Sequence, residues 1–311
     1  MKLVHYFNRP EYLFRPHQIY RKVFHSKTSY THQFKKASLP WGSTINIFLD
    51  RDDRVGRSII AHGIYDLALT ETVWRLSAPG ETAVDVGANI GYVTSVLARR
   101  VSLTGKVYSF EPNPEVYELL LKNVEGWRKS KEWSPILTYP TALSRKSGAG
   151  MLQVPLGNRG EASLISTRET GSLKDNTNCC VAVTLAALDE IIEDSSPIGV
   201  MKLDVEGHEL SVLHGSKRLI NAGHIRDIIF EDHQGYPSPV TCFLEKHGYT
   251  IFRLWKGFWG PKLKLPQKQL IHPWEPPNYL ATREVARAVS LFNNVGWYSL
   301  FNQDTLTYQK K

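Results

Sequence analysis

The stretch from Thr82 to Val101 constrains the fold more than any other part of this chain of 311 residues. Thr82–Val86 has the pattern of a short buried strand, Gly87 permits a sharp turn, and an amphipathic helix begins near Gly91. A strand that ends at glycines and leads into a helix lets the backbone approach a ligand closely and directs free N–H groups at it. We therefore expect a ligand site in this loop. The apolar face of the helix consists of Val93, Val96, Leu97 and Val101.

Short apolar runs alternate with helical periodicity along most of the remaining chain. Repeated units of this kind predict an α/β fold with a mostly parallel sheet and helices on both faces. Residues 144–186 interrupt the alternation, and we predict an inserted β-hairpin there, in which Met151–Pro155 pairs with Cys180–Leu185. The predicted strands of the sheet are Thr82–Val86, Lys106–Glu111, Pro135–Leu143, Gly199–Val205, Arg226–Glu231 and Tyr249–Leu254.

These patterns divide the chain into three parts. Residues 1–56 form a basic, aromatic N-terminal extension, in which Ile45–Leu49 is a short predicted strand. Residues 57–255 form the α/β domain, with its insertion at about 144–186, and residues 256–311 form a C-terminal extension rich in Pro and Trp. We expect a helical stretch near Thr282–Phe292 in the C-terminal extension.

The net charge of +8 is concentrated at the N-terminus. Residues 1–40 contain eight Lys and Arg side chains against one acid, and aromatic residues alternate with them. One interpretation is an arm that binds nucleic acid through phosphate contacts and base stacking. The interpretation we favour is a helical extension that packs its aromatic side chains on the domain or on a second subunit. We therefore do not expect nucleic acid as a partner. A homo-oligomer could form through this extension.

No apolar run approaches the roughly 18 residues that a membrane-spanning helix needs. Residues 1–10 lack the apolar core of a signal peptide, which leads us to expect a cytoplasmic protein. The three cysteines, Cys179, Cys180 and Cys242, are odd in number and lack the spacing of metal ligands. We therefore expect free thiols and no metal site.

The loop Gly87–Gly91 decides between two classes of nucleoside ligand. A dinucleotide site has the pattern G-x-G-x-x-G, but here Asn89 occupies the second glycine position and Asp85 would repel a pyrophosphate. A cationic ligand with an amino-acid group and no phosphate suits these residues, and S-adenosylmethionine is such a ligand. Glu111 follows the second strand and is positioned for the two ribose hydroxyls.

Three motifs in register resemble the FkbM family of S-adenosylmethionine-dependent methyltransferases. The three motifs are Val84–Tyr92, Phe110–Pro114 and Lys202–Glu209. Two further segments, Gly63–Asp66 and Ile229–Glu231, also agree with the pattern of this family. The resemblance covers about residues 57–255 and implies the class I methyltransferase (Rossmann-like) fold, with a mostly parallel seven-stranded sheet. It also implies methylation of a hydroxyl oxygen on a sugar, glycolipid or secondary metabolite. The cofactor residues it implies are Asp85, Gly87, Ala88, Asn89, Gly91, Glu111, Pro112, Asn113, Ala142 and Asp204.

Chemically active side chains follow the later strands, where ligands bind in parallel α/β sheets. The candidate catalytic residues are Asp204, Glu206, His208, Glu231 and His233. Asp204 or Glu206 would bind or deprotonate the acceptor hydroxyl, His208 or His233 would assist, and Glu231 would line the acceptor pocket.

Each of these candidates has a structural alternative. Asp204 could bind only the cofactor amine, Glu206 could cap the following helix, and Glu231 could form a salt bridge. Two further functions also stay open: a nucleic-acid or nucleotide-binding module without methyl transfer, and a catalytically inactive scaffold of the same fold. The sequence does not identify the acceptor.

Overall fold

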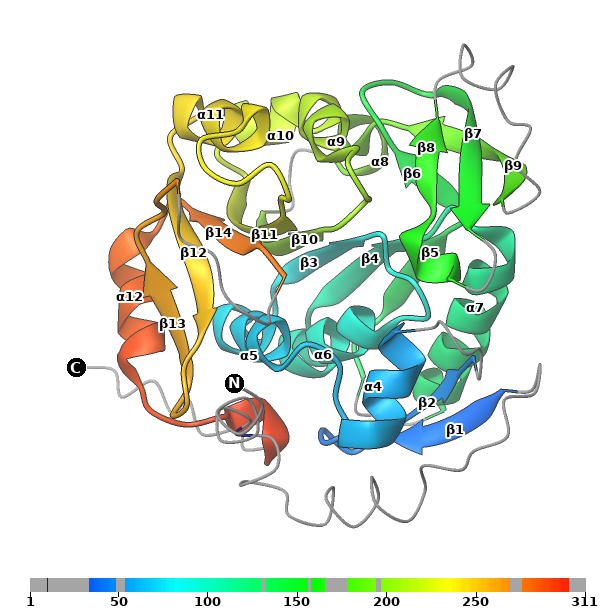
Figure 1. Cartoon of the computed structure of the whole chain (residues 1–311), viewed down its shortest axis with the longest axis horizontal. Coiled ribbons are helices and arrows are strands. Elements are labelled where there is room, and N and C mark those ends of the chain that lie inside the picture. Colours follow the sequence, from blue (N-terminus) through cyan, green and yellow to red (C-terminus); the bar gives the residue numbers. More distant parts are fainter. Residues whose placement is uncertain are drawn as a thin grey trace.

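A twisted eight-stranded sheet forms the centre of the protein (Figure 1). The computed structural model describes residue 10 and residues 34–48, 54–129, 133–155, 158–165, 178–193, 197–268 and 276–301. The five neighbouring strands from β11 to β5 are parallel, β14 runs antiparallel to β11 and β12, and β13 runs antiparallel to β12. In spatial order the strands are β13 (Pro261–Lys264), β12 (Thr250–Lys256), β14 (Asn278–Thr282), β11 (Ile225–Glu231), β10 (Ile198–Leu203), β3 (Thr82–Val86), β4 (Lys106–Phe110) and β5 (Ile136–Tyr139).

The predicted α/β class and the mostly parallel sheet are confirmed, but the sheet contains eight strands where the sequence predicted seven. The additional strand, β13, forms a hairpin with β12. Both β13 and β14 lie in the part that the sequence analysis treated as a C-terminal extension. The structure places β14 inside the sheet, between β11 and β12, so this extension is part of the central architecture.

Helices cover both faces of the sheet, as predicted, and each face has its own apolar core. One face is covered by α5, α6, α7 and α12, and the other by α8, α9, α10 and α11, which lie above the sheet in Figure 1. The helices are α4 (Arg54–His62), α5 (Leu67–Leu76), α6 (Tyr92–Val101), α7 (Pro114–Arg128), α8 (Leu188–Ile191), α9 (Glu209–Gly215), α10 (Lys217–Asn221), α11 (Pro239–Lys246) and α12 (Val285–Asn293), with 3-10 turns η1 (Arg159–Glu161) and η3 (Tyr298–Leu300).

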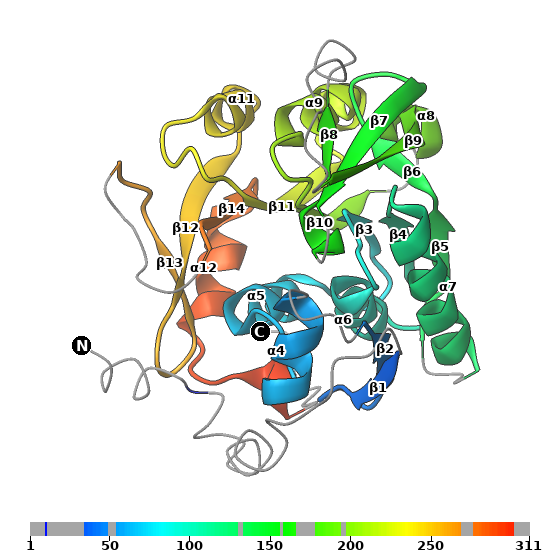
Figure 2. The same cartoon turned by 45° about the vertical axis from the view of Figure 1, so that its right-hand side comes forward.

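The insertion forms a second sheet of four strands, β6 (Thr141–Leu143), β9 (Asn178–Ala186), β7 (Gly148–Pro155) and β8 (Ser163–Ile165). The predicted antiparallel pairing is confirmed, since Met151 lies opposite Ala182. The predicted strand Pro135–Leu143 is wrong as a single strand, because Pro140 has no N–H and separates β5 from β6, which join different sheets. Figures 1 and 2 show the second sheet beside α9 and above β4.

The described part of the N-terminal section packs on the domain. β1 (Lys35–Ser38) and β2 (Thr44–Ile47) form a small antiparallel sheet, and Asn46 hydrogen-bonds with Asn123 of α7 at 2.7 and 2.8 Å. Trp41 is buried and its indole donates to Ser95 Oγ at 3.1 Å. The predicted helical extension and its role in oligomerisation lie largely outside the described residues. None of the described helices is both long enough and apolar enough to cross a membrane.

Candidate active site

A cavity of about 700 Å³ opens at the carboxyl ends of β3, β4, β10 and β11. Further parts of its wall come from α4, α5, α6, the second sheet and η1. This volume is in the range of pockets that enclose small organic ligands. Seven of the ten predicted cofactor residues and all five predicted catalytic residues line it. Asp85, Gly91 and Asn113 are not among the residues that line it.

Close packing explains the glycines of the first loop. Gly87 has φ +72°, and a Cβ atom there would lie 1.9 Å from the carbonyl oxygen of Asp204. The N–H groups of Gly87 and Ala88 both donate to the carbonyl of Phe110, at 3.0 and 2.9 Å. Gly91, with φ +91°, precedes α6, and a Cβ atom would come within 2.7 Å of Leu120. The loop is thus held against both neighbouring strands, and only glycine fits at these two positions.

Asn89 and Glu111 connect this loop to the end of β4. Asn89 adopts a left-handed conformation, which asparagine tolerates better than most residues. Its N–H donates to Glu111 Oε2 at 2.8 Å, and the N–H of Asn113 donates to Glu111 Oε1 at 2.9 Å. Burial raises the pKa of Glu111 to about 7, while the two N–H groups and the charge of Lys202 oppose that rise. Each carboxylate oxygen keeps a lone pair that can accept a ligand hydroxyl.

Lys202 lines the cavity, and it is the first residue of the motif Lys202–Glu209, for which the sequence predicted no role at this position. It is 5% exposed, and its Nζ lies 3.6 Å from Asp85 Oδ1 and 3.5 Å from Asp204 Oδ2. It also donates to the carbonyl of Gly87 at 2.6 Å. A lysine in the otherwise apolar strand Ile198–Leu203 was the signal for this role. Asp85 is fully buried and also accepts from Thr94 Oγ1 at 2.6 Å, so it acts on the cavity through Lys202.

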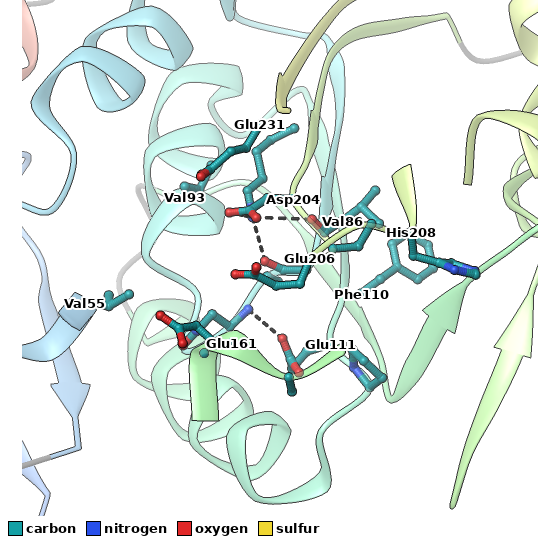
Figure 3. A pocket seen from close by; sticks show the side chains of 18 of the residues that line it. Val55, Val86, Val93, Phe110, Glu111, Glu161, Asp204, Glu206, His208 and Glu231 are labelled. Atoms are coloured by element: carbon teal, nitrogen blue, oxygen red, sulfur yellow. Dashed lines mark hydrogen bonds and ion pairs between the residues drawn. The ribbon is translucent and has the colours of Figure 1, made fainter. Parts of the chain in front are cut away.

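Three carboxylates gather on the side of the cavity formed by β10 and β11. Figure 3 shows Asp204, Glu206 and Glu231 together, with Glu161 of η1 nearby. Burial raises the pKa of Glu231 to about 8, and the charges of Asp204, Glu206 and Asp66 act in the same direction. Partial burial raises the pKa of Glu206 to about 7, and the charges of Asp204, Glu161 and Glu209 act in the same direction.

The turn that carries Glu206 has an unusual backbone. Glu206 has φ +51°, which is uncommon for a residue other than glycine, and Gly207 follows with φ +94°. The helical segment after β10 therefore starts only at Glu209, and it divides into α9 and α10. Glu206 does not cap it, since His208 occupies the N-cap position. Glu209 accepts from the N–H groups of Val205 and Gly207, which holds the turn in place.

The two candidate histidines have different surroundings. His233 Nε2 lies 2.7 Å from Glu231 Oε1, and the imidazole is 73% exposed, so it connects this carboxylate with solvent. His208 Nε2 lies 2.9 Å from Ser144 Oγ, and burial lowers the pKa of its ring. In Figure 3 His208 points away from the three carboxylates. The structure therefore pairs His233, and not His208, with the acidic group.

Residues from outside the predicted motifs complete the wall. Glu161 of η1 forms an ion pair with Arg54 of α4 at 3.1 Å, and Arg159 forms one with Glu115 of α7 at 2.7 Å. These contacts hold η1 across the cavity, and a sequence rich in Gly, Ser and Asn provided no local signal for them. Tyr65 also faces the cavity, and burial raises the pKa of its hydroxyl well above the ordinary value. Within the described residues, no group of three or more His, Cys, Asp or Glu is arranged to hold a metal ion.

The fold and the site together define the class of protein. The parallel strands in the order β5-β4-β3-β10-β11, with helices on both faces and a cavity at their carboxyl ends, are the architecture of a class I S-adenosylmethionine-dependent methyltransferase. A family model described as the methyltransferase FkbM domain matches residues 85–251, which is more than half of the chain. The chain belongs to the FkbM methyltransferase family, whose cofactor is S-adenosylmethionine.

Several curated methyltransferases are similar to this chain. The hexuronic acid methyltransferase AglP of Haloferax volcanii is 28% identical over 165 residues, which are 52% of this chain and 60% of that protein. The methyltransferase sdnD of Sordaria araneosa is 25% identical over 207 residues, which are 57% of this chain and 76% of that protein. The chain thus spans less than two thirds of the length of AglP.

Solved structures of methyltransferases are also similar to it. The FkbM methyltransferase of Methylobacillus flagellatus has 14% sequence identity and a TM-score of 0.39, and the match covers 74% of this chain and 55% of that one. An S-adenosylmethionine-dependent O-methyltransferase of Thermotoga maritima has 15% identity and a TM-score of 0.38, and the match covers 81% of this chain and 77% of that one.

Proposed function

We propose that this protein transfers a methyl group from S-adenosylmethionine to a hydroxyl oxygen of a sugar, glycolipid or secondary metabolite. The observation that carries the proposal is the meeting of two groups of residues in one cavity. The glycine loop and Glu111 suit a nucleoside, and the carboxylates after β10 and β11 suit a hydroxyl that must lose its proton. The similarity to AglP, a hexuronic acid methyltransferase, supports a sugar acceptor.

The cofactor fits the residues on the nucleoside side. A carboxylate held by two backbone N–H groups, as Glu111 is, can accept two vicinal ribose hydroxyls. Gly87, Ala88 and Asn89 line the cavity, and Gly87 packs directly on the backbone of Asp204, where a Cβ atom would not fit. Apolar side chains around Ala142 would cover the base. When bound, S-adenosylmethionine supplies the methyl group from an electrophilic sulfonium.

The acceptor side would orient the hydroxyl and remove its proton. Asp204 is held by Lys202 at 3.5 Å and would accept a hydrogen bond from the acceptor. Glu231, with a pKa of about 8, is matched to proton transfer near neutral pH. The proton would pass from Glu231 to His233 at 2.7 Å, and from this exposed imidazole to water. Asp204 and Glu206 together would keep the hydroxyl directed at the methyl group, which is the alignment that in-line displacement requires.

Release of S-adenosylhomocysteine in the presence of a panel of hydroxylated acceptors tests the proposal. The panel should contain neutral sugars, amino sugars and uronic acids, and calorimetry should compare the binding of S-adenosylmethionine with that of NAD. We expect acceptor-dependent release, which Asp204→Asn lowers at least about 100-fold, whereas Glu118→Gln on the exposed side of α7 leaves it unchanged. Unchanged transfer by the Asp204 variant, or tight binding of NAD alone, would contradict the proposal.

A further inference from the structure

The side chain of Lys202 makes contacts beyond the backbone pairing of its strand. Among the lysines and arginines of the cavity wall in the described part of the chain, Lys202 alone is buried. Its Nζ donates to the carbonyl oxygens of Val86 and Gly87, at 3.3 and 2.6 Å. These two carbonyls lie at the point where β3 turns into the cofactor loop. One ammonium group on β10 therefore fixes the conformation of a loop on the neighbouring strand.

The same ammonium group lies among carboxylates from every strand around it. Burial lowers the pKa of Lys202, but the charges of Asp204, Asp85 and Glu111 outweigh that effect, and its pKa lies above the ordinary value. The side chain is thus a permanent cation at neutral pH. Burial raises the pKa values of four carboxyls, and in each case the charge of Lys202 opposes that rise. These carboxyls are Asp85 of β3, Glu111 after β4, Glu206 after β10 and Glu231 of β11.

We propose that Lys202 is a positioning residue that couples the two halves of the site: it holds the cofactor loop by its carbonyls and, through its ion pair with Asp204, favours the ionised form of the carboxylates on the acceptor side. Only the effect of Lys202 on the acceptor-side carboxylates rests on the proposed function. Holding the loop concerns cofactor binding, which can be measured without any acceptor. The ion pair with Asp85 at 3.6 Å completes the arrangement, since it balances the lysine from the side away from the cavity.

The test compares Lys202→Met with the double variant Asp85→Asn/Lys202→Met. The single variant leaves Asp85 as a buried carboxylate without its cation, and we expect it to be less stable. The double variant removes both charges, and we expect its melting temperature to return towards that of the natural protein. Calorimetry from pH 5 to pH 9 should show affinity for S-adenosylmethionine at least about tenfold weaker in both variants, because a charged hydrogen bond to the loop is lost.

The pH profile separates a positioning role from a structural one. In both variants we expect the acidic limb of the turnover profile, and of cofactor affinity, to move upward by about one pH unit or more. Lys256→Met is the matched control, since Lys256 is equally buried on β12 but lies outside the cavity wall. We expect Lys256→Met to leave the pH dependence of turnover and of cofactor affinity unchanged.

Recovery of both affinity and the natural pH profile in the double variant would overturn the inference and leave Lys202 with a purely structural role. Unchanged affinity in Lys202→Met would show that the loop does not depend on the lysine. Absence of methyl transfer by the natural protein to every acceptor would instead defeat the proposed function. In that case the affinity measurements across pH still decide the role of Lys202.

Discussion

Replacing Glu231 by glutamine removes a carboxyl whose ionised form is disfavoured by its surroundings in the folded protein. Burial raises the pKa of this group from 4.5 to about 8, and Asp204, Glu206 and Asp66 add to the rise. A folded-state pKa above the ordinary value means that the natural protein is most stable while the group is protonated. That stability is fully present below about pH 4.5 and is lost as the pH rises through about 8.

The size of the effect follows from the pKa difference. At about 1.4 kcal/mol per pH unit, a rise from 4.5 to about 8 corresponds to an upper limit of roughly 5 kcal/mol at pH 9. The side chain of Glu231 is 22% exposed, and its Oε1 lies 2.7 Å from His233 Nε2. Solvent and the imidazole therefore offset part of the energetic cost of ionising this carboxyl. We expect Glu231→Gln to raise the free energy of unfolding by about 2 kcal/mol at pH 9 and to leave it nearly unchanged at pH 4.5.

Urea denaturation at several pH values between 4.5 and 9 measures this directly. Glu118→Gln, exposed on α7, is the control for loss of one negative charge at the surface. The same Glu231 variant should lose methyl transfer, because glutamine cannot accept the proton of the acceptor. Equal gains in stability at both ends of the pH range, or a loss at pH 9, would refute the reasoning. Either result would mean that burial does not penalise the ionised carboxylate.

Two other substitutions test the cofactor side. Glu111→Gln should weaken binding of S-adenosylmethionine at least about tenfold with the fold retained, and equal affinity by calorimetry would exclude the ribose role. Gly87→Ala should destabilise the protein by roughly 3 kcal/mol or more, because φ is +72° and a Cβ atom would lie 1.9 Å from the carbonyl oxygen of Asp204. A melting temperature equal to that of the natural protein would show that the loop can move away from β10.

The candidate site could be predicted largely because its signals are local. The glycines, Asn89 and Glu111 lie at turns that the strand pattern identifies, and polar residues at the ends of buried strands meet at one edge of a parallel sheet. The direction of each side chain could not be predicted in the same way. Asp85 was expected to contact the cofactor, yet a residue inside a buried strand points to one face or the other according to its packing, and here it faces Lys202.

The same distinction applies to the sheet. Pro276 and Pro277 precede β14 closely, and its five residues have no clear alternation, so the sequence contained no strong signal for a strand inserted between β11 and β12. Antiparallel pairing with both neighbours stabilises it there. The histidines were equivalent in sequence, and only packing separated them, with His233 beside Glu231 and His208 beside Ser144.

The sequence by itself determined the α/β alternation of residues 82–254, the glycine loop after the first strand and the family, because periodicity and turn chemistry depend on neighbours in the chain. The tertiary structure decided which charges meet. Lys202 and Gly87 are 115 residues apart, and they come within 2.6 Å only because β10 pairs with β3. Contacts of that kind depend on which strands become neighbours, and this is settled by the packing of the whole sheet.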